Sequence, residues 1–329
     1  MSETTLYPLR FEPIFQYRLW GGRRLSHLLS APLPDGPVGE AWILSDREDH
    51  PSRIANWSLK GRTLGEVMEQ SQEQLMGRLA LRFRRFPLLL KFLDVREMLS
   101  VQVHPSDKDP ELIPAGETSK TEAWVVIATQ KGSRIYAGLQ PGTTEADLHS
   151  ALAGGKIAER LLAIDPKQGD AIFIPAGTVH TLGDGVVVFE VQQNSDVTFR
   201  LYDWGHTDSK TGQPRPLQVN QAFASIDFAG STGGLVKPVI EATAPVLRER
   251  LFDCGYFNLW RLHGVAPFSV GATGVPRVLV CIQGSGQLEH NNIPYTVGKG
   301  EAWLLPAEIG VCPFRPAEET TLLEIAIPE

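Results

Sequence analysis

The stretch from Gly169 to Arg200 reads GDAIFIPAGTVHTLGDGVVVFEVQQNSDVTFR, and the interpretation of the rest of the chain depends on it. A short apolar run ends at Pro175, which lacks an N–H and cannot continue a sheet ladder. Gly177 supplies the backbone freedom for a sharp turn, and His180 follows before a further apolar strand. This pattern is how a β-barrel presents a metal ligand, although a lone turn histidine is equally typical of an ordinary surface residue.

The composition limits the kind of protein. A chain of 329 residues has room for two domains, and 42% apolar with 21% charged residues is typical of a globular protein. The net charge of -7 argues against a nucleic-acid partner, which requires a basic face. No apolar run approaches the roughly 20 residues of a membrane span, and no secretion signal opens the chain. We therefore expect neither nucleic acid nor a membrane as a partner.

The cysteine content agrees with an intracellular location. Cys254, Cys281 and Cys312 are an odd number, are widely spaced and include no CxxC pair. Such cysteines are typically reduced, which favours the cytoplasm. We expect a monomer or a small homo-oligomer.

Two segments upstream of the opening stretch carry metal-competent side chains. In LSVQVHPSD, Leu99–Asp107, strict alternation places Gln102 and His104 on the same face of a strand. In KTEAWVVIA, Lys120 and Glu122 share a face at the start of the next apolar strand. Polar, solvent-facing strands are the alternative explanation for each segment taken alone.

Helices are expected at four places. Thr63 and Thr144 each begin a capping-box pattern ahead of apolar residues at helical spacing. Further helices are predicted over Lys156–Leu162 and within Val219–Phe228. These segments would form a small helical element among the strands.

An internal repeat indicates the fold of the chain. The pattern Gly169-x5-Pro175-x-Gly177-x-x-His180 resembles the second motif of the cupins, which are small β-barrels. It recurs as GEAWLLPAEIG from Gly300, where the histidine position holds Val311. The chain is therefore predicted to be mainly β, with two cupin-type jelly-roll barrels and a small helical element inserted in or beside the N-terminal barrel.

The boundary between the barrels is predicted in the Gly-rich stretch Ser231–Lys237. Residues 1–236 would then form a metal-binding catalytic domain with short helices. Residues 237–329 read as short strands with turn signals, and they would form a degenerate barrel that has lost its ligands.

The candidate ligands are two imidazoles, one carboxylate and one amide oxygen, from His104, His180, Glu122 and Gln102. This set suits zinc or another borderline divalent metal. Three strong protein ligands leave a position for water or substrate, which is the catalytic rather than the structural arrangement.

Several segments in order resemble the short bacterial form of the type I mannose-6-phosphate isomerases (phosphomannose isomerases). They are PLLLKFLD, LSVQVHPSD, KTEAW, FIPAGTVH and QQNSDVTFRLYDWG, and together with WGGRRL and GEAW they extend the resemblance over most of residues 10–230. The resemblance implies an enzyme of carbohydrate metabolism: a zinc-dependent aldose–ketose isomerase with one zinc ion per chain. Its substrates would be mannose 6-phosphate and fructose 6-phosphate, interconverted through an enediol or enediolate.

The resemblance also implies roles for individual residues. The metal ligands would be Gln102, His104, Glu122 and His180. Arg200, Lys120 and Asp196 would be catalytic, and Lys91, Lys120 and Arg200 would bind the substrate. The proton carrier stays open among Lys120, Asp196, Glu190 and a water on the metal.

Other functions remain as alternatives. A non-catalytic sugar-phosphate-binding bicupin would bind a ligand without turnover, and an isomerase of a related sugar phosphate would use the same site. An iron-dependent cupin oxidoreductase would prefer a compact set of two histidines and one carboxylate, which Gln102 and the lysines fit poorly.

Overall fold

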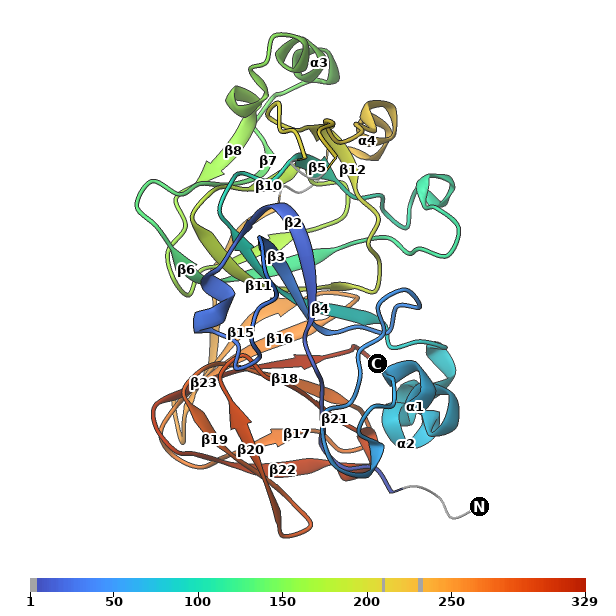
Figure 1. Cartoon of the computed structure of the whole chain (residues 1–329), viewed down its shortest axis with the longest axis vertical. Helices are drawn as coiled ribbons and strands as arrows, with labels where there is room; N and C mark the ends of the chain where they lie inside the picture. Colours follow the sequence, from blue (N-terminus) through green and yellow to red (C-terminus); the bar gives the residue numbers. More distant parts are fainter. Residues whose placement is uncertain (1–4, 209–210, 230–232) are drawn as a thin grey trace.

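Two β-barrels stacked along the long axis make up the fold (Figure 1). The computed structural model describes residues 5–208, 211–229 and 233–329. Each barrel packs a seven-stranded sheet against a smaller sheet, and neighbouring strands run antiparallel. The prediction of a mainly β chain with two cupin-type barrels is confirmed.

The first barrel contains the segments that were predicted to carry the site. In spatial order its larger sheet consists of β13 (Gly234–Val236), β9 (Ala171–Ile174), β6 (Glu122–Thr129), β11 (Val186–Gln193), β4 (Leu88–Val95), β2 (Ile14–Gly22) and β3 (Val38–Leu44). Its smaller sheet consists of β12 (Phe199–Tyr202), β5 (Val101–Val103), β10 (His180–Leu182), β7 (Ile135–Leu139) and β8 (Leu161–Ile164).

The second barrel repeats this arrangement. Its larger sheet consists of β1 (Leu9–Arg10), β21 (Ala302–Leu305), β18 (Arg277–Gln283), β23 (Thr320–Ala326), β16 (Asn258–Gly264), β15 (Leu247–Asp253) and β14 (Val239–Ala242). Its smaller sheet consists of β17 (Phe268–Gly271), β22 (Val311–Pro316), β19 (Ser285–His290) and β20 (Ile293–Gly298). The strand β1 joins this barrel from the opposite end of the sequence, because Leu9 pairs with Leu304.

Helices flank both barrels. The segment α1 (Leu64–Gln70), α2 (Gln72–Met76) and the 3-10 helix η3 (Gly77–Arg82) lies beside the second barrel, where the backbone N–H of Arg78 donates to the carbonyl of Gly274 at 3.0 Å (Figure 1). The helices α3 (Glu145–Ala153) and α4 (Val219–Ser225) cover the first barrel. Among the described residues, no helix is long and apolar enough to cross a membrane.

The helix signals in the sequence had mixed outcomes. Both capping boxes form. The side chains of Thr63 and Thr144 accept a hydrogen bond from the backbone N–H three residues later, and the side chains of Glu66 and Asp147 accept from the backbone N–H of the threonine. The helix predicted over 156–162 is wrong, since only the short 3-10 helix η5 (Ile157–Arg160) forms there. Leu161 begins β8 instead and is buried, so strand pairing with β7 overrides the local helical preference.

The remaining 3-10 helices connect strands. They are η1 (Arg24–His27), η2 (Trp57–Leu59), η4 (Pro110–Leu112) and η6 (Ala307–Ile309).

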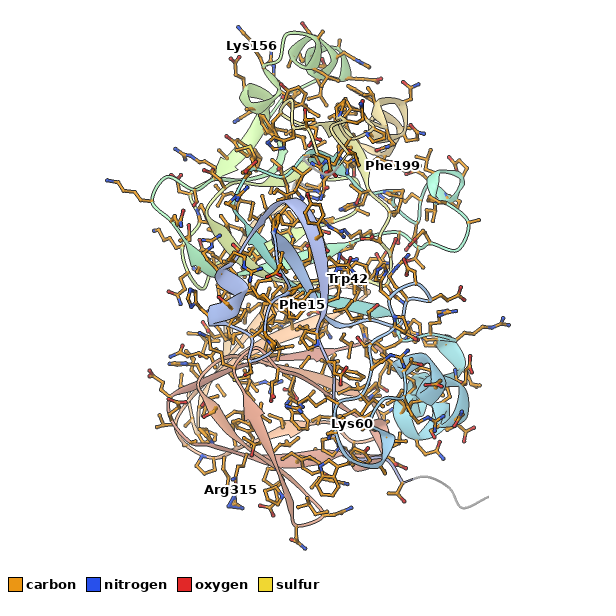
Figure 2. The ribbon with its side chains drawn as sticks, in the orientation of Figure 1. Phe15, Trp42, Lys60, Lys156, Phe199 and Arg315 are labelled. Carbon is orange, nitrogen blue, oxygen red and sulfur yellow. The ribbon has the colours of Figure 1, made fainter. Side chains whose placement is uncertain are left out.

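A continuous hydrophobic core runs through both barrels. One cluster of buried side chains includes Phe189 in β11 of the first barrel and Leu323 in β23 of the second. At the contact between the barrels the ring of Phe173 lies 6.1 Å from Phe252 and 6.5 Å from Phe257, centre to centre. Figure 2 shows side chains filling the interior of both units. Burying a side chain such as Phe257 contributes about 1.5–3 kcal/mol, so the barrels stabilise one another.

Candidate active site and metal centre

The predicted turn after β9 positions two of the candidate ligands. Gly177 has a φ of 88°, a value that only glycine adopts readily, and its N–H donates to the carbonyl of His104 at 2.9 Å. His180 then begins β10 and lies directly opposite Gln102 of β5. Both strands belong to the smaller sheet, whereas Glu122 begins β6 of the larger sheet. The site therefore lies between the two sheets of the first barrel.

The three strongest ligand candidates meet in the interior. One ligand atom each from His104, Glu122 and His180 lies within 4.8 Å of the others. Nε2 of His104 is 3.4 Å from Oε2 of Glu122, and Nε2 of His180 is 3.3 Å from Oε1. The amide nitrogen of Gln102 is 3.1 Å from Nε2 of His180. All four predicted ligands are therefore adjacent.

The protonation of this cluster suits a bound cation. Nδ1 of His180 donates to the carbonyl of Thr178 at 2.8 Å, so Nε2 presents a lone pair to the carboxylate of Glu122. Burial lowers the pKa of His180, and burial together with the Lys120 ammonium lowers the pKa of His104 to about 3. Both rings are therefore neutral near neutral pH, and both Glu122 oxygens lack a well-aligned hydrogen-bond donor among the described residues.

The donor set fits a divalent metal. Two neutral imidazoles and a carboxylate are the ligands that zinc and similar ions take in catalytic sites. A half-turn of the Gln102 amide would present its oxygen to the same point in place of its nitrogen. The residues of the cluster could therefore hold a metal ion with three strong ligands and one amide oxygen.

Lys120 borders the cluster. Its Nζ is 3.0 Å from Oε2 of Glu122 and 3.3 Å from Nε2 of His104, and its side chain is buried. Burial disfavours the charged ammonium, but the carboxylates of Glu122 and Glu190 outweigh this cost and raise the pKa of Lys120. The lysine is therefore a fixed positive charge beside the candidate metal ligands.

A cavity of about 390 Å³ opens next to the cluster. Its wall includes Gln102, the fourth ligand candidate, and every other residue that the sequence analysis assigned to the site. These are Lys91, Lys120, Asp196, Arg200 and the proton-carrier candidate Glu190. The structure thus brings all the predicted site residues to one place.

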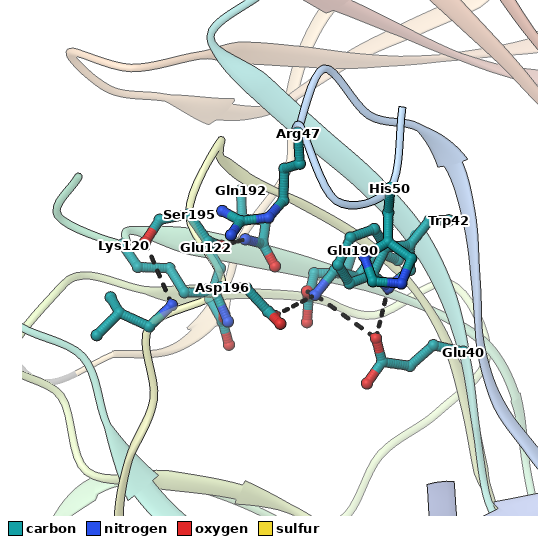
Figure 3. Close-up of polar contacts among 12 residues, drawn as sticks. Glu40, Trp42, Arg47, His50, Lys120, Glu122, Glu190, Gln192, Ser195 and Asp196 are labelled. Atoms are coloured by element: carbon teal, nitrogen blue, oxygen red, sulfur yellow. Dashed lines mark hydrogen bonds and ion pairs between the residues drawn. The ribbon is translucent and has the colours of Figure 1, made fainter. Parts of the chain in front are cut away.

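Lys91 lies almost fully buried in the wall of this cavity. Its ammonium is 3.7 Å from a carboxylate oxygen of Glu40 and 3.6 Å from those of Glu190 and Asp196. Figure 3 labels these three carboxylates. The ammonium also lies 4.8 Å from the centre of the Trp42 ring, within cation–π range. Three carboxylates and an aromatic face compensate for the burial of this charge.

The pKa values of two of these carboxyl groups are shifted in opposite directions. Burial, reinforced by Glu122, raises the pKa of Glu190 to about 7, while the indole of Trp124 donates to it at 2.8 Å. Burial acts on Glu40 in the same direction, but Arg18 and Lys91 outweigh it and lower the pKa of Glu40 to about 2. Of these two carboxyls, Glu190 is therefore the one whose pKa suits proton exchange near neutral pH.

Arginines occupy another part of the cavity wall. Nε of Arg200 donates to Ser100 at 3.2 Å and Nη1 donates to the Pro216 carbonyl at 2.9 Å. Among the described residues Arg200 has no ion-pair partner, and burial together with the nearby charge of Arg215 lowers its pKa. An unpaired guanidinium crowded by a like charge favours binding of an anion.

Sequence reasoning missed four charged residues of the cavity: Arg18, Glu40, Asp208 and Arg215. Arg18 forms an ion pair with Glu40 at 2.6 Å, and two nitrogens of Arg215 donate to the two carboxylate oxygens of Asp203. Glu40 shares a strand face with Trp42 in GEAW, and this pairing was a usable signal. Arg18 lies in β2 and Arg215 in a loop, and no periodic pattern in the sequence indicates either of them.

Known proteins match both the sequence and the fold. A model of the catalytic domain of type I phosphomannose isomerase matches residues 9–133. Mannose-6-phosphate isomerase ManA of Bacillus subtilis is 35% identical over 309 residues, which are 93% of this chain and 95% of that protein. The chain belongs to the type I phosphomannose isomerases.

Solved structures agree with this assignment to the isomerase family. The crystal structure of the mannose 6-phosphate isomerase from Bacillus subtilis has a TM-score of 0.89 at 30% identity, covering 97% of this chain and 99% of that one. A putative mannosephosphate isomerase from Archaeoglobus fulgidus, 20% identical with a TM-score of 0.79 over the full length of both chains, shares the fold.

This member of the isomerase family has a second, larger cavity of about 870 Å³. It lies on the other side of the turn Asn194–Asp196, and its wall includes Arg47, Glu117 and Asn194. None of the predicted metal or substrate residues lines it. The smaller cavity is therefore the candidate active site.

Proposed function

We propose that the chain is a zinc-dependent aldose–ketose isomerase that interconverts mannose 6-phosphate and fructose 6-phosphate through an enediol or enediolate. The observation that carries this proposal is the arrangement of one cavity: it adjoins a buried His–Glu–His cluster and also contains an arginine that has no ion-pair partner among the described residues. Family membership supports the same activity.

The metal would be held by His104, Glu122 and His180, with the amide oxygen of Gln102 as a fourth ligand. Neutral imidazoles with one carboxylate favour zinc, one ion per chain. When bound, the ion would supply Lewis-acid stabilisation of the charge that develops on the sugar oxygens. The buried carboxylate oxygens that lack aligned donors support this assignment.

Proton transfer would fall to the cavity wall next to the cluster. The reaction removes a proton from one of the two carbons C1 and C2 and returns it to the other, so a group that gains and loses protons near neutral pH is required. Lys120 and Asp196 are assigned catalytic roles here because both line the cavity. Glu190 has the acidity that a proton carrier needs, and its pKa of about 7 supports it as their partner.

The anionic part of the substrate would meet Arg200. A guanidinium makes two parallel bonds to a phosphate or to an enediolate, and Arg200 has no carboxylate partner among the described residues to compete. Lys91 lies in the same wall with its charge already shared among three carboxylates, so we assign it to hydroxyl contacts with the sugar.

We also propose a division of the chain into residues 1–236 and 237–329, with the exception of β1, which pairs with β21 of the second barrel. The strand β13 pairs with β9 of the first barrel and β14 pairs with β15 of the second, which supports a change of barrel between them. Residues 231 and 232 of the predicted boundary lie outside the described residues. The three free cysteines support the cytoplasm as the compartment.

The test is an isomerase assay coupled to metal analysis. Purified protein should form fructose 6-phosphate from mannose 6-phosphate, lose activity with a strong chelator and regain it with zinc. Glu122→Ala should lose both zinc and activity, whereas Glu324→Ala, which removes a buried carboxylate of the second barrel, should retain zinc. Zinc retained by Glu122→Ala would contradict the ligand assignment.

The substrate has its own controls. A zinc-loaded protein that binds mannose 6-phosphate without forming fructose 6-phosphate would indicate a non-catalytic binding protein. Turnover of a different aldose phosphate in its place would indicate a related isomerase.

A further inference from the structure

The turn Asn194–Asp196 separates the two cavities of the first barrel. Asp196 lines the smaller cavity, which is the candidate active site, and Asn194 lines the larger one. Ser195 between them is fully buried. The position of this turn therefore decides where the Asp196 carboxylate lies.

Glu117 holds the turn from the side of the larger cavity. Its Oε2 accepts from the hydroxyl of Ser195 at 3.0 Å and from the backbone N–H of Asp196 at 3.1 Å. The next link is Arg47, which follows β3 and donates to both Glu117 oxygens, at 2.9 Å and 2.7 Å. Glu117 thus joins a guanidinium to two groups of the turn, and Figure 3 shows Arg47, Ser195 and Asp196 side by side.

The Arg47–Glu117 pair is stronger than an ordinary surface ion pair. Both side chains are mostly buried, 15% and 17% exposed, and the contact is bidentate. The hydrogen bond to Glu117 raises the pKa of Arg47. Burial acts against ionisation of Glu117, but the bonds from Arg47 and the turn outweigh it and lower the pKa of this carboxyl. Both groups therefore stay charged near neutral pH.

The same turn reaches the charged wall of the active site. Oδ1 of Asp196 is 3.6 Å from Nζ of Lys91, and Nζ of Lys91 is 3.6 Å from Glu190. The contacts therefore run without interruption from Arg47 through Glu117 and Asp196 to Lys91. A shift of the turn would move the Asp196 carboxylate away from the lysine.

We propose that Arg47 and Glu117 are positioning residues of the isomerase, which act on the reaction by fixing the Ser195–Asp196 turn against the active-site cavity. The inference rests on the proposed function, because it assigns the consequence to Asp196 and Lys91. The physical reason is that Ser195 and the Asp196 N–H lose their acceptor when the Glu117 carboxylate is removed. Displacements of about 1 Å at a catalytic group can cost up to about 100-fold in rate.

The first test compares two charge-removing substitutions. Glu117→Gln weakens the bidentate pair and the acceptor for the turn. Its matched control is Glu249→Gln, which weakens the Arg261–Glu249 pair of the second barrel, with a 2.7 Å contact and side chains 18% and 13% exposed. We expect Glu117→Gln to lower kcat/KM roughly 10- to 100-fold and Glu249→Gln to change it less than about twofold, with similar losses of Tm.

The second test distinguishes a positioning role from an ion pair that only stabilises the fold by joining two loops. The exchange Arg47→Glu with Glu117→Arg restores an ion pair between the same backbones but leaves no carboxylate to accept from Ser195 and Asp196. A positioning role predicts that Tm recovers while kcat/KM stays low. Recovery of kcat/KM to the wild-type value would overturn the proposal.

Hydrogen exchange provides a readout that does not depend on activity. We expect the Asp196 amide to exchange at least about tenfold faster in Glu117→Gln than in wild type, with no change in Glu249→Gln. Unchanged exchange together with unchanged kcat/KM would refute the positioning role. If wild type proves inactive on mannose 6-phosphate, the proposed function fails, whereas the exchange result still decides whether Glu117 fixes the turn.

A second variant covers the case in which Glu117→Gln does not fold. Arg47→Lys keeps the Glu117 acceptor and the positive charge but loses the bidentate contact. We expect an intermediate loss of kcat/KM, about three- to tenfold, and partly faster exchange at Asp196. Wild-type values for both would overturn the proposal.

Discussion

The two barrels contain turns at corresponding positions with different chemistry. In the first barrel β9 leads through Pro175 to His180, which begins β10 and is fully buried. In the second barrel β21 leads through Pro306 to Val311, which begins β22 and is 53% exposed. The strand and the proline therefore recur in both barrels, whereas the proposed metal centre requires His180 and three further residues that converge on it.

The second barrel uses the equivalent position for packing. Glu308, where the first barrel has Gly177, accepts a hydrogen bond from the backbone N–H of Leu6. Trp303 and Leu305 of β21 are buried in the core. This turn fastens the N-terminal segment to the barrel.

The largest effect is expected when His180 is replaced by valine, the residue at the corresponding position of the second barrel. His180→Val should reduce zinc affinity by more than about 100-fold and abolish isomerisation, because loss of a direct ligand exceeds the loss of a supporting contact. The fold should persist, since valine suits the start of a strand. Metal analysis, activity and circular dichroism of the same preparation check this. A variant that keeps one zinc ion per chain would show that His180 is not a ligand.

Removal of the anion-binding charge should have the next largest effect. Arg200→Ala should lower kcat/KM about 100-fold through the lost guanidinium contacts, with zinc content unchanged. Arg200→Lys should recover only part of this loss, because an ammonium cannot make the paired contact. Steady-state kinetics with mannose 6-phosphate measure both variants. Activity of Arg200→Ala equal to wild type would exclude a role in the reaction.

A smaller effect concerns stability where the two barrels meet. Burial raises the pKa of Asp46 to about 6, although the backbone N–H of Phe86 donates to it at 2.7 Å. A raised folded-state pKa means that its contribution to stability is full below the unfolded value of about 3.8 and is lost as pH rises through about 6. Asp46→Asn keeps an acceptor and cannot ionise.

The Asn variant should therefore gain stability relative to wild type between about pH 4 and pH 6, by up to about 3 kcal/mol. Urea unfolding of both proteins across this range measures the difference. A difference that is constant with pH would contradict the shifted carboxyl.

The reverse substitution, which gives the second barrel a histidine at this position, should have almost no effect on metal binding. Val311→His places an imidazole at the start of β22. Within the part of the chain that the structure describes, however, three metal-competent side chains come together only at His104, Glu122 and His180. Metal analysis should still give one zinc ion per chain. A second ion would indicate that the second barrel retains more of a ligand set than its sequence suggests.

The sequence predicted which candidate residues lie together where their placement follows local rules. Alternation placed Gln102 and His104 on one face, and the Pro-Ala-Gly turn aimed His180 at them. It failed where tertiary contacts decide. The segment after Lys156 became the strand β8, because pairing with β7 outweighs helical spacing. Arg18 and Arg215 reach the cavity from distant segments that carry no periodic signal.

The link between Arg47, Glu117 and the turn was equally invisible in the sequence. The three segments are far apart in the chain, and each reads as an ordinary polar loop. Only the folded arrangement places a guanidinium on a carboxylate that also accepts from the turn.

The strand β1 has a consequence for synthesis on the ribosome. Leu9 pairs with Leu304, and Arg10 forms an ion pair with Glu301 at 2.6 Å. At translation rates of about 5–20 residues per second, the emerging β1 must wait roughly 15–60 s for its partner strand. The first barrel can assemble during that interval, so a protease or chaperone would meet nascent chains whose N-terminal segment is still unpaired. Closure of the second barrel onto β1 would then be one of the last events of synthesis.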